Sequence, residues 1–308
     1  MKKVFIDGSA GTTGLRIRQR LGQRDDIKLV TLSEEKRKDP AARLDALTSA
    51  DIAFLCLPDD AARETAAAAH DADTVIIDTS TAHRTAEGWT YGMPELAGMR
   101  ARIADSHRIA NPGCHASGFI ALIAPLVGAG VIPPDTPLSC FSLTGYSGGG
   151  KKMIAEYEES VDELLSAPRL YALGEEHKHL SEMTKISGIM RPPLFVPVVS
   201  DYYAGMLTAV QFYADGVNVQ SIRDIYKDVY ATGLIKYTED GTEGGFMSGA
   251  RMAGRDDMEI SVHGNSERLL LTARFDNLGK GASGAAVQNM NIVLGIPEDT
   301  GLVTGDNK

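Results

Sequence analysis

The sequence predicts an α/β protein of two domains, the first built on a parallel sheet and the second an α+β domain with a mixed sheet. Three observations support this fold class. Strand-like and helix-like patterns alternate over the first 112 residues, which is typical of a parallel sheet with helices on both faces. A glycine-rich turn joins the first strand to the first helix. Beyond residue 137 strand-like segments outnumber helices, which favours antiparallel pairs.

The composition is that of a globular protein with room for two domains. The chain has 308 residues, of which 43% are hydrophobic and 23% are charged. Its net charge of −10 argues against nucleic acid or an anionic membrane as the main partner, while basic residues can still form a local anion site. No apolar run approaches the ~20 residues that a membrane span needs.

The N-terminus and the cysteines favour a cytoplasmic protein. Met1-Lys2-Lys3 leads directly into a strand, so no signal peptide is expected. The three cysteines, Cys56, Cys114 and Cys140, are sparse and odd in number, which indicates a reducing compartment without a disulfide framework.

The first domain is expected to alternate short strands and helices. Cys56 lies in a continuous apolar run, so we interpret it as a core residue of a buried strand. The predicted strands are 3–7, 27–32, 51–57, 74–78 and 108–111, and the predicted helices follow Gly14 and cover 40–49 and 60–70.

The first turn, Gly8 to Gly14, is typical of a dinucleotide-binding site. It follows a strand and precedes a helix, and this context allows a pyrophosphate to sit on the helix N-terminus. Gly8 would permit the tight turn, and Gly11 would permit close approach of the backbone to the ligand. The spacing is G-x-x-G-x-x-G rather than G-x-G-x-x-G, so a glycine turn without a ligand remains the alternative.

The segment after the second strand favours NADP over NAD. An acidic residue there would bind the ribose 2′-hydroxyl of NAD. Here the strand ends in Ser33, and Lys36, Arg37 and Lys38 follow, which suits a 2′-phosphate. The alternative is a solvated charged turn.

Asn111-Pro112-Gly113-Cys114 places a thiol just before an apolar run, 116–127, that reads as a helix. Unpaired N–H groups and the positive end of the helix dipole favour the thiolate at such a position. The sequence therefore predicts a nucleophile for covalent catalysis at Cys114. A small buried residue at a helix cap is the alternative.

His177 and His179 are the histidines most suited to act with this thiol. The pKa of a histidine lies near neutrality, so either can serve as a general acid or base. Two residues apart, they share one face only if the segment is extended. A polar surface turn is the alternative, and a metal site is disfavoured because no further His or Cys lies at ligand spacing.

Two further segments follow strands at the expected ligand-binding edge. Arg84 lies after strand 74–78, where it could hold a phosphate or carboxylate by a bidentate contact, or be a surface arginine. Segment 146–152 combines glycines, which permit close backbone approach, with two lysines; a flexible loop is the alternative.

The second domain is expected to combine a mixed sheet with long helices. Cys140 lies within the first of its strands, and we interpret it as structural. The predicted strands are 137–144, 194–199, 204–213 and 268–276, and the predicted helices are 116–127, 151–166, 218–231 and 282–294, the last after the glycine-rich turn 279–284.

Taken together, these segments resemble the shorter form of the N-acetyl-γ-glutamyl-phosphate reductase family, in the aspartate-semialdehyde dehydrogenase superfamily. The runs Tyr91-Gly92-Met93-Pro94-Glu95-Leu96 and Asn111-Pro112-Gly113-Cys114 carry most of the specificity, and the resemblance covers nearly the whole chain. The chain departs from the longer form at His115, where tyrosine is usual, and in the motif His-Lys-His-Leu-Ser-Glu. The other matching segments are 8–14, 80–84, 145–150, 177–179 and 276–284.

The resemblance implies a Rossmann-type domain of residues 1–112 completed by 280–308, and a catalytic and oligomerisation domain of residues 113–279. It implies attack of the Cys114 thiolate on an acyl phosphate, reduction of the thioester by NADPH, and a homodimer or homotetramer without metal. The implied site residues are Cys114, His177 and His179 for catalysis, Arg84, Ser147, Gly148 and Asn111 for substrate, and Gly8, Gly11, Thr12, Thr13, Gly14, Ser33, Arg37, Ser80 and Asn289 for the cofactor.

Three other functions remain open from the sequence. An aspartate-semialdehyde dehydrogenase would share fold and chemistry and differ in its acyl group. A non-catalytic NADP-binding protein would bind cofactor without turnover. A cysteine hydrolase using Cys114 and His177 would leave the N-terminal glycines without a role.

Overall fold

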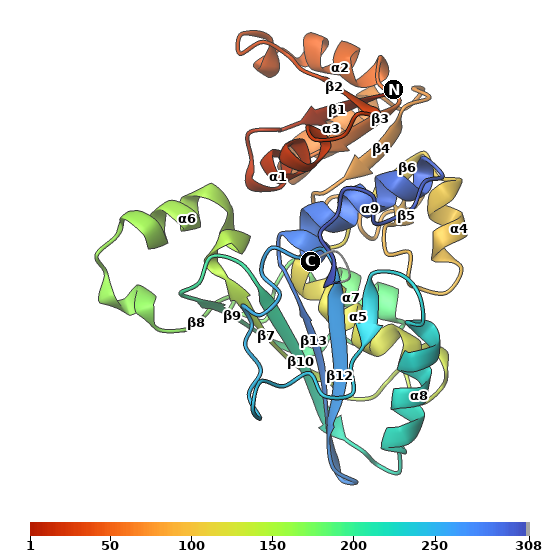
Figure 1. Ribbon diagram of the computed structural model, residues 1–308, viewed down its shortest axis with the longest axis vertical. Helices are drawn as coiled ribbons and strands as arrows, with labels where there is room; N and C mark the ends of the chain where they lie inside the picture. Colours follow the sequence, from red (N-terminus) through yellow and green to blue (C-terminus); the bar gives the residue numbers. More distant parts are fainter. Residues whose placement is uncertain (306–308) are drawn as a thin grey trace. The chain divides into compact units, whose positions relative to one another are not determined.

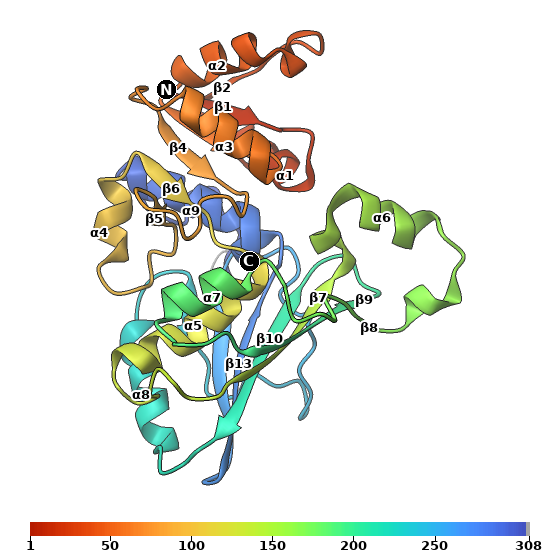
Figure 2. The ribbon, with the colours of Figure 1, turned by 180° about the vertical axis from the view of Figure 1, so that it is seen from behind.

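The computed structural model describes residues 1–305, which form two compact units (Figures 1 and 2). The first comprises Met1–Pro112 and Ala282–Leu302, and the second is built on Gly113–Gly281. The expected domain of 280–308 differs at both ends, because 280–281 and 303–305 group with the second unit. Val303 N donates to Asp256 Oδ2 (2.8 Å), and this bond fixes the C-terminal segment to the second unit. Residues 306–308 lie outside the described residues.

The sheet of the first unit is parallel throughout, as predicted. Its strand order is β2-β1-β3-β4-β6-β5, so the chain steps outward from β1 on both sides (Figure 1). This is the doubly wound arrangement whose ligand site lies at the carboxyl ends of the strands. The strands are β1 (Lys2–Asp7), β2 (Ile27–Val30), β3 (Ile52–Leu55), β4 (Val75–Asp78), β5 (Thr90–Tyr91) and β6 (Arg108–Ala110).

Helices flank this sheet, and the C-terminal helix returns to it as predicted. A buried cluster that includes Phe5, Leu47, Leu55 and Ile76 fills the space between strands and helices. Arg24 Nη1 donates to Asn291 Oδ1 (2.6 Å) and so joins the segment after α1 to α9. The helices are α1 (Thr12–Leu21), α2 (Pro40–Thr48), α3 (Asp59–Ala68), α4 (Met99–Ala104) and α9 (Gly284–Val293), with the short turn η1 (Lys36–Lys38). The turn η4 (Gly279–Ser283), which precedes α9, includes residues of both units.

The sheet of the second unit is mixed, which confirms the predicted α+β arrangement. Its order is β11-β12-β13-β10-β7-β9-β8, with β7–β9 and β11–β12 parallel and the other pairs antiparallel. The strands are β7 (Ser139–Gly145), β8 (Arg169–Leu170), β9 (Leu194–Ser200), β10 (Met206–Tyr213), β11 (Ile235–Tyr237), β12 (Met258–Gly264) and β13 (Arg268–Phe275).

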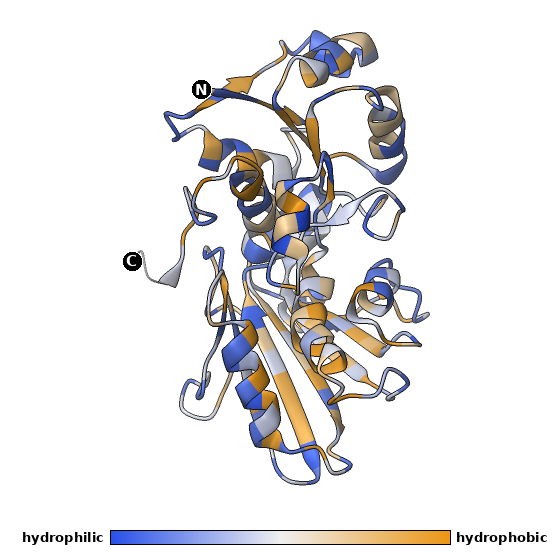
Figure 3. Cartoon of the chain, turned by 90° about the vertical axis from the view of Figure 1, so that its right-hand side faces the viewer, coloured by the Kyte–Doolittle hydropathy of each residue, from blue (hydrophilic) through white to orange (hydrophobic). Residues whose placement is uncertain are grey.

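Helices α5, α7 and α8 lie on one face of this mixed sheet (Figures 1 and 2). Figure 3 shows α8 striped in hydrophilic and hydrophobic residues, and its buried face carries Ile222 and Tyr226. Tyr230 Oη donates to Ala121 O (2.6 Å), which joins α8 to α5. These helices are α5 (Cys114–Gly128), α7 (Leu180–Ser187) and α8 (Val219–Val229), and α6 (Gly150–Glu159) follows the turn η2 (Tyr146–Gly149).

The predicted helix 151–166 is wrong in its second half. α6 ends at Glu159, Ser160 is extended, and a separate short turn η3 (Glu163–Ser166) follows, capped by the Asp162 side chain. Three glutamates crowd the end of α6, where the negative end of the helix dipole disfavours them. The sequence patterns also did not predict α7 or β12.

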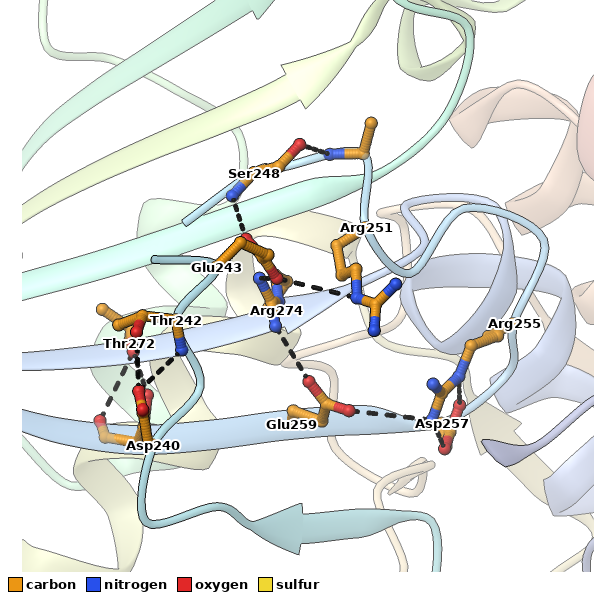
Figure 4. Close-up of polar contacts among 12 residues, drawn as sticks. Asp240, Thr242, Glu243, Ser248, Arg251, Arg255, Asp257, Glu259, Thr272 and Arg274 are labelled. Atoms are coloured by element: carbon orange, nitrogen blue, oxygen red, sulfur yellow. Dashed lines mark hydrogen bonds and ion pairs between the residues drawn. The ribbon is translucent and has the colours of Figure 1, made fainter. Parts of the chain in front are cut away.

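A charged network holds the long segment between β11 and β12 against the sheet (Figure 4). Arg274, which is 3% exposed, donates to Glu243 Oε1 (2.5 Å) and Glu259 Oε2 (3.2 Å). Arg255 forms a two-pronged ion pair with Asp257. Because both guanidinium groups meet carboxylates, the charges of the buried Arg274 and Asp257 are compensated.

None of the helices within residues 1–305 has the length and apolar character required to cross a bilayer.

Candidate functional site

The glycine turn of the first unit is shaped by close packing of backbone. Gly8 has φ of 83°, and a Cβ there would lie 2.2 Å from Cys56 O. A Cβ on Gly14 would lie 2.6 Å from Gly8 O. A Cβ on Gly11 would make only an ordinary contact, at 3.5 Å from Gly8 O, so packing within the chain does not require that glycine.

The start of α1 offers donors to an anion. Gly11 is the N-cap and its side chain cannot cap, so the first N–H groups of α1 are available to a ligand. Thr12 Oγ1 is buried and has no hydrogen-bond partner in the structure. An orphaned hydroxyl beside a helix N-terminus fits a phosphate group, because buried polar atoms are otherwise nearly always paired.

The segment after β2 is exposed. Ser33 O accepts the N–H groups of Lys36 and Arg37 (both 3.0 Å), which folds the segment into η1. Arg37 Nη2 lies 2.8 Å from Glu34 Oε2, with both side chains largely exposed. The hydroxyl and the guanidinium therefore remain accessible just beyond the carboxyl end of β2.

The loop after β4 is organised by a buried carboxylate. Asp78, fully buried, accepts hydrogen bonds from Ser80 N (2.9 Å) and Ser80 Oγ (2.7 Å). Its Oδ2 lies 2.6 Å from His83 Nδ1, and the His83 ring stacks on Trp89 at 4.0 Å. The hydroxyl of Ser80, a predicted cofactor contact, thus already has a structural partner.

Arg84 is buried rather than a surface arginine. Its Nε donates to Asn111 O (3.0 Å) and its Nη2 to Thr79 O (3.2 Å). These bonds join the loops after β4 and β6, both at the carboxyl edge of the sheet. The guanidinium therefore has a structural function besides the anion-binding role that the sequence predicts for it.

Asn111 and Asn289 connect the same edge to the last helix. Asn111 Nδ2 donates to Ala282 O (3.0 Å), and Asn289 Nδ2 donates to Gly92 O (2.9 Å). A Cβ on Gly92 would lie 2.4 Å from Asn289 Nδ2, so this approach needs glycine. Asn289 Oδ1, like Thr12 Oγ1, is buried and has no hydrogen-bond partner in the structure.

In the second unit, Cys114 is the first residue of α5, as predicted. Gly113 is the N-cap, and its N–H donates to Glu182 Oε2 (3.2 Å). Cys56 and Cys114 are partly exposed and Cys140 is buried, and burial of the sulfur raises the pKa of Cys56 to about 12 and also raises that of Cys140. Cys114 lies at a helix N-terminus, a position that favours the thiolate, whereas burial disfavours the thiolate at the other two cysteines.

The glycine-rich turn before α9 approaches this thiol. A Cβ on Gly281 would lie 2.9 Å from Cys114 Cβ, so a side chain there would force the two segments apart. Close approach to Cys114 is therefore a reason for glycine in this motif.

His177 and His179 lie together in the turn that leads into α7. Their ring centroids are 4.7 Å apart, and His179 N donates to His177 Nδ1 (3.1 Å). Because Nδ1 accepts, a neutral His177 carries its proton on Nε2. His179 is buried, and its Nε2 lies 3.9 Å from Glu182 Oε1.

Sequence reasoning missed three members of this cluster. Glu182 bridges Gly113 and His179, although only its place in the motif had been noted. The sequence marks His115 only as a departure from the longer family form and gives no signal for Tyr171. The His115 ring lies 5.6 Å from that of His177, and its Nε2 lies 2.6 Å from Tyr171 Oη.

Ser147 and Gly148 are held in place by the end of β13. Ser147 is 1% exposed, and Asn277 Nδ2 donates to its Oγ (3.0 Å). Asn277 Oδ1 in turn accepts from Gly205 N (2.8 Å). A Cβ on Gly148 would lie 3.4 Å from Asn277 Nδ2, an ordinary contact, so packing within the chain does not require glycine there. Within residues 1–305, no group of three or more His, Cys, Asp or Glu side chains is arranged to hold a metal ion.

Comparison with known proteins identifies both units. Residues 3–105 match the family described as semialdehyde dehydrogenase, NAD binding domain, and residues 114–277 match semialdehyde dehydrogenase, dimerisation domain. The chain is 42% identical to N-acetyl-gamma-glutamyl-phosphate reductase of Trichormus variabilis, over 97% of this chain and 99% of the relative. It is 44% identical to the protein of that name from Chelativorans sp., over 95% and 98%.

Solved structures show the same fold. Aspartate semialdehyde dehydrogenase II from Vibrio cholerae superposes with a TM-score of 0.74 at 20% identity, covering 96% of this chain and 98% of that chain. Aspartate semialdehyde dehydrogenase from Candida albicans, solved with NADP, has a TM-score of 0.68 at 14% identity, over 96% and 98%. With two domain families matched in order and relatives above 40% identity over nearly its whole length, the chain belongs to the semialdehyde dehydrogenase family, among the N-acetyl-γ-glutamyl-phosphate reductases.

Proposed function

We propose that this protein reduces N-acetyl-γ-glutamyl phosphate to N-acetylglutamate γ-semialdehyde with NADPH and releases phosphate, a step of arginine biosynthesis. The observation that carries this proposal is the partly exposed Cys114 at the start of α5, in one cluster with His177, His179 and Glu182. The substrate assignment is supported by relatives of that name at 42–44% identity. The structural neighbours that act on aspartate semialdehyde are at 14–20% identity, which supports only the fold.

The first unit fits a dinucleotide. The backbone turn between Gly8 and Gly14, the N–H groups of α1 and the orphaned Thr12 Oγ1 would hold the pyrophosphate. Asn289 Oδ1 would accept a hydrogen bond from the cofactor, and Ser33 and Arg37 would bind the 2′-phosphate of NADP. When bound, the nicotinamide supplies the hydride.

Covalent catalysis begins at the sulfur of Cys114. The thiolate forms a bond to the acyl carbon, the bond from that carbon to the phosphate oxygen breaks, and phosphate leaves with the electron pair. After hydride reaches the thioester carbon, the tetrahedral oxyanion collapses, the C–S bond breaks, and the aldehyde and thiolate separate. The N–H groups at the start of α5 are positioned to stabilise negative charge in both steps.

His177 is the proposed proton carrier. Its Nδ1 is occupied by the His179 N–H, so Nε2 presents the proton that can be given to an oxyanion and taken back. His179 is buried against Glu182 and would orient this turn rather than exchange protons with substrate. Ser147 and Gly148 would contact the substrate, since Asn277 fixes their position.

The second unit would also form a homodimer, through the sheet face opposite α5. Phe141 and Val196 are paired neighbours on β7 and β9, and each remains more than one-third exposed. Leu194 (68% exposed) and Tyr213 (72%) extend this apolar face. Exposed large apolar side chains on a sheet face are typical of a subunit interface. Sedimentation should show the wild type as a dimer or tetramer and Phe141→Glu as a smaller species.

Reliance on a free thiol favours a reducing compartment, the cytoplasm.

The test is an assay of both semialdehydes with NADP and phosphate, in the reverse direction. The acetylglutamate compound should react far faster than aspartate semialdehyde. The reverse preference would contradict the substrate assignment but not the mechanism. Turnover that does not need NADP(H) would instead favour a cysteine hydrolase.

A further inference from the structure

A chain of hydrogen bonds runs from the buried sheet of the second unit to the cluster around Cys114. Thr208 Oγ1 on β10 lies 3.0 Å from Ser142 Oγ on β7, and Ser142 Oγ lies 2.7 Å from His115 Nδ1. His115 Nε2 lies 2.6 Å from Tyr171 Oη. Thr208, Ser142 and His115 are at most 2% exposed, so this polar chain is shielded from water. Buried polar groups are costly unless paired, and here each meets the next.

The His115 ring is neutral in this setting. Burial, together with the neighbouring His177 and Lys178, lowers its pKa to about 3. A neutral imidazole has one donor and one acceptor nitrogen. Two arrangements of protons are therefore possible along the chain, and they differ at its far end.

In the first arrangement, Tyr171 O–H donates to His115 Nε2, and Nδ1–H donates to Ser142. In the second, Ser142 O–H donates to Nδ1 and Nε2–H donates to Tyr171 Oη, so the phenolic O–H keeps its proton and can donate a hydrogen bond to another acceptor. Burial and the negative charge of Cys114 both raise the pKa of Tyr171. The hydroxyl therefore keeps its proton and interacts electrostatically with the sulfur. A negative charge at Cys114 favours the second arrangement.

We propose that His115 is a positioning residue that holds the Tyr171 hydroxyl as a hydrogen-bond donor for the negative charge that forms at Cys114. His115 is next to Cys114 in the chain, so the first turn of α5 places the nucleophile and the residue that directs this donor together. The proposal rests on the proposed function only in taking Cys114 as the nucleophile. The histidine need not contact substrate, because it acts through Tyr171.

The test measures the reactivity of the thiol without substrate. Iodoacetamide alkylation of Cys114, followed by mass spectrometry across a pH series, reports the midpoint of thiolate formation. The midpoint should rise by about one pH unit in Tyr171→Phe, since a hydrogen bond to a charged group is lost. The other titratable groups of this cluster, His177, Lys178, His179 and Glu182, are unchanged in that variant.

Two substitutions of His115 separate its two bonds. An asparagine amide reaches the position of Nδ1, toward Ser142, and a glutamine amide reaches that of Nε2, toward Tyr171. His115→Asn should therefore show the midpoint of Tyr171→Phe, and His115→Gln should restore much of the wild-type value. His263→Asn is the matched control, because His263 Nε2 also bonds a serine hydroxyl, Ser261 Oγ at 2.8 Å on β12, and its midpoint should be unchanged.

Turnover gives a second readout. Tyr171→Phe and His115→Asn should each lower kcat about tenfold with little change in KM, and the double variant should fall no further. Unchanged alkylation midpoints in both variants, with folded protein by circular dichroism, would overturn the proposal. Shifted midpoints in a protein that fails to reduce the acyl phosphate would instead refute the substrate assignment and leave the role of His115 intact.

Discussion

The glycine turn of the first unit and the thiol cluster of the second are built in different ways. The turn consists of seven consecutive residues, Gly8 to Gly14, and its shape depends on main-chain contacts and missing side chains. The cluster draws on residues 113–115, 142, 171, 177–182 and 208, which come from helices, strands and loops. One is a local structure and the other is assembled by the fold.

This contrast predicts how each region responds to substitution. A local backbone site should fail when a side chain is added, and the failure should include the stability of its own unit. An assembled site should lose activity when a polar group is altered, with little effect on cofactor binding. The substitutions below test that separation, from the largest expected effect to the smallest.

Cys114→Ser should lower kcat by ~10⁴-fold, because a neutral hydroxyl is a far weaker nucleophile than a thiolate. NADPH binding, followed by the change in nicotinamide fluorescence, should keep its Kd because the residues proposed to bind the cofactor belong to the other unit. A variant that lost both activities would show that the two regions are not separable. Retained steady-state reduction would exclude covalent catalysis at this position.

Gly8→Ala should destabilise the protein by roughly 3 kcal/mol and abolish NADP binding, because its Cβ would clash with Cys56 O in a positive-φ conformation. Gly88→Ala is the matched control: Gly88 has φ of 78° and nothing within 4 Å of an added Cβ. That control should cost only about 1 kcal/mol, the conformational part alone. Urea unfolding measures both, and equal losses would show that close packing is not what requires Gly8.

Glu182→Gln should lower kcat about 30-fold while NADPH binding is kept. The amide can still accept from Gly113 N but loses the charge that faces His179. Glu176→Gln, at an exposed position of the same segment, is the control and should match the wild type. If both variants behave alike, the buried bridge between the nucleophile turn and the histidine turn has no catalytic role.

Arg37→Ala should raise the KM for NADPH about tenfold and leave kcat and the KM for NADH nearly unchanged, because only the 2′-phosphate contact is lost. Arg63→Ala is the control, since Arg63 is also exposed and also pairs with an acidic neighbour, Asp60. Steady-state kinetics with both nucleotides measures this. A parallel rise for NADH would mean that Arg37 stabilises the turn and does not read the phosphate.

The alternation of strands and helices in the first unit was largely predictable, because buried parallel strands and amphipathic helices carry local patterns. Errors lie at ends: the predicted strand 27–32 stops at Val30, and 51–57 stops at Leu55. Leu32 and Cys56 are apolar yet lie in partly buried loops, and hydrophobicity alone does not separate a strand from the loop that follows it. Short elements such as α7 have too few residues to show a period.

The site was predictable only in part. The position of Cys114 at a helix start follows from the adjacent Pro-Gly turn and the apolar run. The histidine motif could be identified in the sequence, but its geometry could not. The hydrogen bonds of His115 with Ser142 and Tyr171 could not be predicted, because these partners are 27 and 56 residues away in the chain. Arg84 looked equally like a surface residue, and only the fold shows its guanidinium buried on carbonyl groups.

The amino-acid sequence was enough to determine the α/β class, the glycine turn and the cysteine at a helix start, since each depends on properties of neighbouring residues: periodicity, φ freedom and a helix N-terminus. The tertiary structure alone decided which polar side chains surround the thiol and which are committed to the scaffold. A hydrogen bond reaches only about 3 Å. Its partners are therefore chosen by how strands and helices pack, which no single segment of the chain encodes.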